Sequence, residues 1–92
     1  MPYDARKVAA SLRRKGFFLR QKDHTFFELI VDGKYAGIFT KISQGEREIG
    51  TPLGKKMQHQ MKLPSSADFR DFVDCPMSAD DYLDLLRRQG NL

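Results

Sequence analysis

Residues 24–41 read HTFFELIVDGKYAGIFTK, and this stretch decides the fold. Its Asp32-Gly33 pair lies between two runs of aromatic and β-branched residues, which is a strong signal for a two-residue type I′ turn. The turn predicts an antiparallel hairpin with strands over residues 24–31 and 34–41, in which Val31 pairs with Lys34. Continuing that pairing outward places His24 opposite Lys41.

Side chains alternate between the two faces of the predicted hairpin. The first face carries Thr25, Phe27, Leu29 and Val31 opposite Thr40, Ile38, Ala36 and Lys34. The second face carries His24, Phe26, Glu28 and Ile30 opposite Lys41, Phe39, Gly37 and Tyr35. Because the second face is the more polar, we expect it to be open to solvent and the first face to be turned toward the core.

Helical and strand patterns flank the hairpin. Asp4 is the predicted N-cap of a helix whose apolar residues recur with helical spacing, and Gly16 is its predicted end. Residues 17–21 are predicted to form a further strand. After the hairpin, Thr51 as N-cap and Pro52 at the first helical position begin another helix. This order predicts an α+β fold with a three-stranded antiparallel sheet, and the α-β-β-β-α unit resembles the double-stranded-RNA-binding fold.

Residues 65–92 predict a helical hairpin that follows the domain of residues 1–64. Ser78 and Asp81 form a near capping box for the second of its helices. The extension holds 3 Lys and Arg against 6 Asp and Glu, whereas residues 1–63 hold 13 against 6. Two interpretations stay open: the acidic extension limits access of a polyanion to the basic body, or its apolar residues only enlarge a small core.

Composition narrows the classes of function. A chain of 92 residues is too short for a large enzyme with an enclosed cofactor cavity, and its single cysteine excludes an internal disulfide or a cysteine-based zinc site. We expect no cofactor, no metal and a packed thiol at Cys75. No apolar run approaches the roughly 20 residues that span a bilayer, so we expect no membrane association and a cytoplasmic location. The net charge of +4 is typical of proteins that bind polyanions. It is equally typical of proteins whose charged surface serves only solubility.

Four segments across residues 4–63 indicate a more specific protein family than the order of the elements does. They read RRKGF, RQKDHTFFEL, TKIS and EIGTPLGKKMQHQMKL. Together they resemble the HicA-like toxins of bacterial and archaeal toxin–antitoxin systems. The resemblance implies a small RNA-binding protein that cleaves mRNA as a metal-independent endoribonuclease, with a cognate antitoxin protein as its partner. It also implies a role for His24, which matches the family's histidine near the start of the second strand.

His24 and Lys41 are the candidate catalytic residues. RNA can be cleaved without a metal when a base removes the proton of a 2′-OH and a cation stabilises the charge that develops on the phosphate. A histidine suits the first role and a lysine the second, and an ammonium across the strand pair favours the neutral imidazole. The alternatives are an ordinary strand-edge histidine and a solvated lysine.

A larger set of residues is predicted to bind RNA. Phe26 and Phe39 would stack unpaired bases on the open face, unless they cover the core instead. The cationic candidates are Lys22, Arg13, Arg14, Lys55, Lys56, His59 and Lys62. A solvated polar helix face explains the helical members of this set equally well. Two other interpretations of the chain stay open, a non-catalytic RNA-binding module and a protein-interaction domain.

Overall fold

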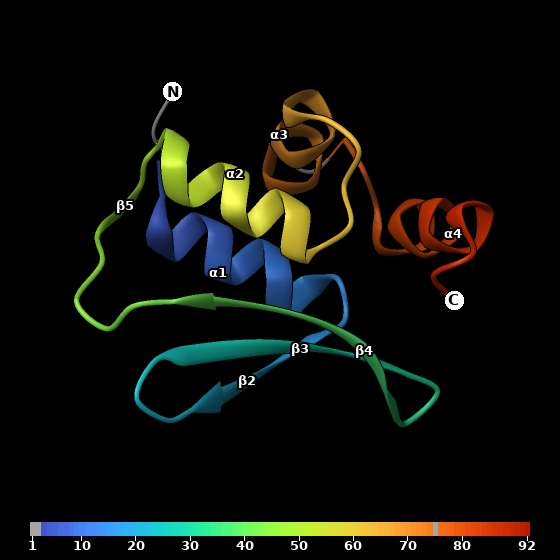
Figure 1. Cartoon of the computed structure of the whole chain (residues 1–92), viewed down its shortest axis with the longest axis horizontal. Coiled ribbons are helices and arrows are strands. Elements are labelled where there is room, and N and C mark those ends of the chain that lie inside the picture. Colours follow the sequence, from blue (N-terminus) through green and yellow to red (C-terminus); the bar gives the residue numbers. More distant parts are fainter. Residues whose placement is uncertain (1–2, 75) are drawn as a thin grey trace.

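Helices cover one face of a three-stranded antiparallel sheet (Figure 1). The computed structural model describes residues 3–74 and 76–92, so Cys75 lies outside the described residues. The described helices are α1 (Ala5–Arg14), α2 (Thr51–Gln60), α3 (Ser66–Asp74) and α4 (Ala79–Gln89). The sheet has the order β2-β3-β4 and consists of β2 (Phe17–Gln21), β3 (Thr25–Val31) and β4 (Lys34–Ile42). The predicted α+β class and the three-stranded antiparallel sheet are confirmed.

A short strand pair lies beside the start of α1. β1 (Tyr3–Asp4) pairs antiparallel with β5 (Glu48–Ile49). The sequence pattern predicts neither strand, because a run of two residues shows no alternation. The pairing ties the start of α1 to the segment that leads into α2.

The β3–β4 hairpin has the predicted turn. Asp32 and Gly33 both adopt positive φ, 52° and 79°, and Val31 pairs with Lys34. Positive φ at both central residues is what a type I′ turn requires. The turn and the first pair of the ladder are therefore confirmed.

The register of the hairpin shifts by two residues beyond Ile30, and this part of the prediction is wrong. Ile30 pairs with Tyr35, as the turn predicts, but Glu28 pairs with Phe39 rather than with Gly37. Gly37 lies in the bulged segment with a φ of 80°, a conformation that glycine adopts without steric cost. Because the shift is an even number of residues, each side chain stays on its predicted face while its partner changes.

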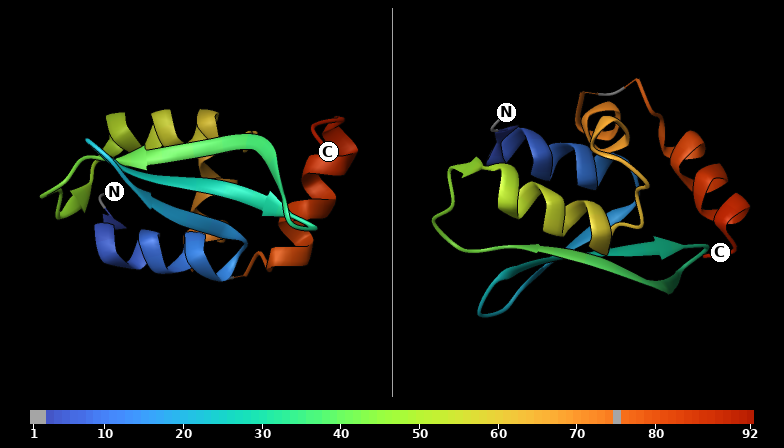
Figure 2. Two further views of the ribbon diagram at one scale, coloured as in Figure 1. Left: turned by 90° about the horizontal axis from the view of Figure 1, so that it is seen from below. Right: turned by 45° about the horizontal axis from the view of Figure 1, so that its top comes forward.

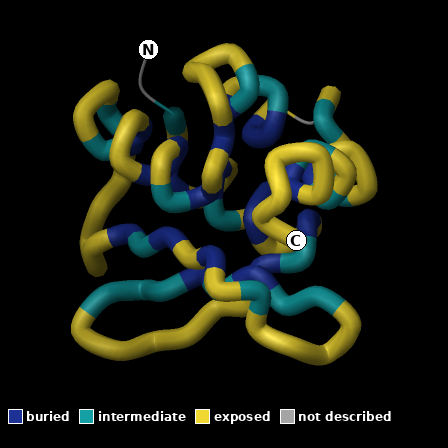
Figure 3. The backbone as a smooth tube through the Cα atoms, turned by 45° about the vertical axis from the view of Figure 1, so that its right-hand side comes forward, coloured by how far each residue is buried: buried dark blue, intermediate teal, exposed yellow. Residues whose placement is uncertain are grey.

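Burial shows which face of the hairpin is turned toward the core. The buried residues of β3 and β4 are Phe27, Leu29, Ile38, Thr40 and Ile42. The residues between them are half-buried or exposed, and burial alternates along β4 (Figure 3). The predicted core face and the predicted open face are both confirmed.

Local capping signals set most of the helix ends. The Asp4 carboxylate accepts a backbone hydrogen bond in the first turn of α1, as predicted. Ser78 and Asp81 form a full capping box at α4, and the hydrogen bonds from Ser78 lower the pKa of the Asp81 carboxyl. At α2 the prediction is one residue off, because Gly50 is the N-cap and Thr51 is the first helical residue.

Aromatic packing joins α3 and α4 to the core. Phe72 of α3 and Tyr82 of α4 are fully buried, and their ring centroids lie 6.1 and 5.8 Å from that of Phe17 in β2. Burial raises the pKa of Tyr82, whose neutral hydroxyl donates a 2.7 Å hydrogen bond to the Met61 carbonyl. The buried ammonium of Lys15 donates to the Phe72 carbonyl and lies 4.6 Å from the centre of its ring. Residues of the acidic extension thus share one core with the rest of the chain.

The outer face of the sheet stays uncovered. Seen from below, β2, β3 and β4 lie in front of the helices, and no described segment crosses them (Figure 2). The acidic extension therefore does not cover this face. Within residues 3–74 and 76–92, no helix has both the length and the apolar character needed to cross a membrane.

The substitution Gly54→Ala is expected to raise the free energy of unfolding by about 0.5–1 kcal/mol, because alanine is favoured over glycine inside a helix. A Cβ atom at Gly54 would meet side-chain atoms of Ile49 and Phe69 at 3.8 Å, an ordinary van der Waals contact. Gly37→Ala is the opposing control, since its positive φ should make alanine destabilising by about 1–2 kcal/mol. Urea denaturation measures whether each substitution raises or lowers the free energy of unfolding. A loss of stability in Gly54→Ala would show that the site does not accommodate the alanine methyl group.

Candidate nucleic-acid interface

The open face of the sheet gathers aromatic and charged side chains from all three strands. Strand pairing arranges them in cross-strand rows. One row contains Arg20, Phe26 and Lys41. The next row contains Phe18, Glu28 and Phe39, and a third contains Ile30 and Tyr35. The side chains of these three rows make up the open face of the sheet.

Aromatic rings on the open face are accessible to a ligand. The exposed fractions are 63% for Phe18, 51% for Tyr35 and 38% for Phe39. Phe26 is half-buried, and its ring centroid lies 6.1 Å from that of Phe39 at an interplanar angle of 42°. The alternative that Phe26 and Phe39 cover the core is wrong, because both lie on the face turned away from it. Clustered exposed aromatic groups of this kind mark an interaction surface.

Cationic groups lie beside these rings. Nζ of Lys41 is 6.0 Å from the Phe26 ring centroid, within the range of a cation–π interaction. Nη1 of Arg20 lies 3.4 Å from Oε1 of Glu28, and the Arg20 side chain is 58% exposed. An ion pair this exposed contributes at most about 1 kcal/mol, so the guanidinium remains available to a ligand. Rings that stack bases and cations that contact phosphates are the two components of a single-strand binding surface.

His24 lies in the turn between β2 and β3, immediately before β3 begins. Its carbonyl accepts a 3.0 Å hydrogen bond from the Lys22 N–H, and the Lys22 carbonyl accepts a 3.1 Å bond from the Gln44 side chain. The prediction that His24 faces Lys41 is wrong, because the register shift pairs Lys41 with Phe26. The Lys41 ammonium therefore does not lie across the strand pair from His24, and its predicted effect on the imidazole has no structural support.

Lys22 is exposed in the turn between β2 and β3, whereas the remaining predicted cations belong to the helix side of the sheet. α1 and α2 lie on the inner side of the sheet, away from the open face (Figure 2). This group of exposed residues lies on α1, on α2 and in the turn after α2. Its members are Arg13, Arg14, Lys55, Lys56, His59 and Lys62. A role for them in RNA binding stays a prediction.

Phe18 and Arg20 belong to the open face, although no motif in the sequence singled them out. Their signal is the alternation within residues 17–21: if Phe17 packs inward, Phe18 and Arg20 must point outward. Placing them beside Phe26 requires the register of β2 against β3, and residues 22–24 contain no turn motif that sets it.

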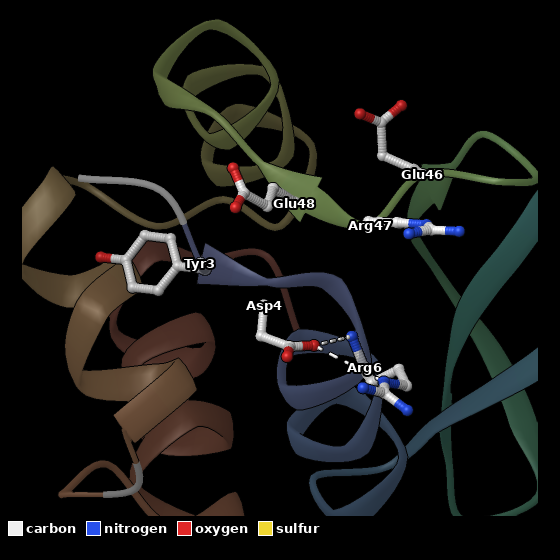
Figure 4. Close-up of a pocket in the computed structure, with 6 residues that line it drawn as sticks. All are labelled: Tyr3, Asp4, Arg6, Glu46, Arg47 and Glu48. Carbon is white, nitrogen blue, oxygen red and sulfur yellow. Dashed lines mark hydrogen bonds and ion pairs between the residues drawn. The ribbon is translucent and has the colours of Figure 1, made fainter.

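A separate depression of about 580 Å³ lies at the β1–β5 pair (Figure 4). Its lining residues are Tyr3, Asp4, Arg6, Glu46, Arg47 and Glu48. The charges are mixed, and Asp4 is already engaged by Arg6, with Nε 3.9 Å from Oδ1. The depression therefore has no converging set of cations for an anion. Among the described residues, no group of three or more His, Cys, Asp and Glu side chains is arranged to hold a metal ion.

Comparison with known proteins assigns no function to the open face. No protein-family model, no curated protein and no solved structure matches this chain.

Proposed function

We propose that this chain binds single-stranded RNA on the open face of its sheet. One observation carries the proposal: exposed Phe18 and Phe39 lie on the same sheet surface as Arg20 and Lys41. Stacking on an aromatic ring contributes about 1–3 kcal/mol per base, and bases outside a duplex are free to make that contact. Arginine and lysine beside the rings supply phosphate contacts, which add affinity for any sequence.

The order of the elements supports RNA as the class of ligand. We infer that α1, the three-stranded sheet and α2 follow the topology of the double-stranded-RNA-binding fold. The chain's sequence segments resemble HicA-like toxins, which are small RNA-binding proteins. On this proposal the open face is also the surface that a cognate antitoxin protein would cover.

The substitution Lys41→Ala is expected to weaken binding of an unstructured RNA 12-mer and to reduce its salt dependence. Loss of one phosphate contact lowers the slope of log K against log salt concentration by about 0.7 for a single strand. Fluorescence anisotropy at several salt concentrations measures both quantities.

Arg70→Ala is the matched control for Lys41→Ala, because it removes one exposed positive charge from α3, on the helix side of the sheet. It should leave the salt slope nearly unchanged. Equal effects of the two substitutions would contradict binding at the open face. Failure of the wild type to bind RNA at all would favour a protein partner for the same surface.

RNA cleavage is a second candidate function, favoured by the position of His24 in the turn that precedes Phe26 in the chain. A strand stacked on Phe26 would pass the turn in which His24 lies, only two residues away in the chain. Cleavage there needs no metal, since the 2′-OH of the substrate is the nucleophile and His24 would act as its base. Cleavage by the wild type in the presence of EDTA distinguishes this function from binding alone.

A further inference from the structure

Glu28 is the feature of the open face that phosphate binding does not explain. Within β2, β3 and β4, it is the only acidic residue on this face. It lies on the central strand and pairs with Phe18 of β2 on one side and with Phe39 of β4 on the other. A carboxylate here repels phosphate groups, so it opposes the binding that the neighbouring cations favour.

The Glu28 carboxylate can accept more hydrogen bonds than it receives within the chain. Its side chain is 25% exposed, and its only hydrogen-bond partner among the described residues is Arg20, at 3.4 Å from Oε1. An ionised carboxylate offers about four lone-pair positions on two oxygens. One long bond from Arg20 therefore leaves both oxygens able to accept further hydrogen bonds from a ligand.

The rings on either side place a stacked base within reach of this carboxylate. Neighbouring strands in a sheet lie about 4.8 Å apart, which is less than the width of a purine. A base stacked on the Phe18 or Phe39 ring therefore extends its edge over the adjacent strand, where Glu28 lies. In single-stranded RNA the Watson–Crick edge is unpaired, so it is free to take this position.

Guanine has the Watson–Crick edge that suits a carboxylate. Its N1–H and N2–H₂ groups are two adjacent donors, which match the two acceptor oxygens of Glu28. Adenine and cytosine place an acceptor beside their donor, and uracil has a single donor between two acceptors. Each of those edges would set a lone pair against the carboxylate.

We propose that Glu28 selects guanine in the single-stranded RNA that binds the open face. The inference rests on the proposed RNA-binding function and adds base selectivity to it. It accounts for an acidic residue between two exposed aromatic rings, where an uncharged residue would bind RNA of any sequence with less repulsion.

The test uses 8-nucleotide RNA probes that are identical except for one central base, which is guanine, adenine or inosine. Inosine keeps N1–H but lacks the N2 amino group, so it removes one of the two donors from a base of similar stacking area. The wild type is expected to bind the guanine probe about fivefold more tightly than either other probe, as measured by anisotropy. Glu28→Gln should abolish this preference and should bind the adenine probe at least as tightly as the wild type does.

Glu46→Gln is the matched control, because Glu46 is an exposed residue at the separate depression near β1 and β5. It should keep the guanine preference of the wild type. Salt-sensitive binding with equal affinity for all three probes would overturn the role of Glu28 and leave RNA binding standing. A preference that persists in Glu28→Gln would also overturn it, and absence of binding to every probe would overturn both proposals.

Discussion

Replacing Phe72 by alanine is expected to lower the free energy of unfolding by about 3–5 kcal/mol, because the change leaves a large cavity in a fully buried site. The Phe72 ring lies 5.0 Å from the Tyr82 ring and 6.1 Å from the Phe17 ring, both edge-on. It also lies beneath the Lys15 ammonium, so its removal exposes several partners at once. Urea denaturation followed by circular dichroism measures the loss.

Phe18→Ala is the matched control for this prediction. Phe18 is the next residue to the buried Phe17 but is 63% exposed on the open face, so its removal creates no cavity. Its expected cost is below about 1 kcal/mol. If Phe72→Ala does not fold, Phe72→Leu keeps most of the volume and should still cost more than Phe18→Ala. Equal losses of unfolding free energy in Phe18→Ala and Phe72→Ala would contradict the packing of α3 into the core.

His24→Ala is expected to lower the rate of RNA cleavage in EDTA about 10²–10⁴-fold, which is the usual contribution of a general base. In the proposed reaction the 2′-oxygen forms a bond to the adjacent phosphorus while the bond to the 5′-oxygen breaks. His24 accepts the proton of the 2′-OH, and the leaving 5′-oxygen takes a proton from solvent water. The products are a 2′,3′-cyclic phosphate and a 5′-hydroxyl, which denaturing gels and mass spectrometry identify.

The comparison variant for cleavage is His59→Ala, which changes the other histidine of the chain. His59 is exposed on α2, which lies on the side of the sheet away from the open face, and its removal should lower the rate far less than His24→Ala does. His24→Ala should still bind RNA and unfold at the wild-type urea concentration. Loss of cleavage in His59→Ala alone would contradict the assignment of His24 as the base. A wild type that does not cleave RNA would leave RNA binding as the proposed function.

Local signals in the sequence were sufficient for the four helices and for the three strands of the main sheet, but not for the short β1–β5 pair. The Asp32-Gly33 turn, the Asp4 cap and the Ser78–Asp81 capping box all form where the sequence predicts them, because each depends on residues within a few positions of one another. Strand alternation likewise predicts the open face of the hairpin, since a period of two residues is a local property.

The register of the hairpin depended on more than its turn. Pairing extrapolated from Asp32-Gly33 puts His24 opposite Lys41, whereas the bulge around Gly37 pairs Lys41 with Phe26. An isolated glycine inside a strand pattern was the available signal of a bulge. Glycine alone does not give the size of the shift, because the packing of Ile38 and Thr40 into the core also determines it.

The sequence by itself determined the class of the fold, the turn of the central hairpin and the side of that hairpin that faces solvent. Only the tertiary structure decided which side chains meet on that side. Phe18 and Arg20 lie beside Phe26 and Glu28 through the pairing of β2 with β3, and the cations of α1 and α2 lie on the other side of the sheet. The physical reason is the range of the interactions: caps, turns and alternation are local, whereas the composition of a binding surface follows from strand register and helix packing between distant residues.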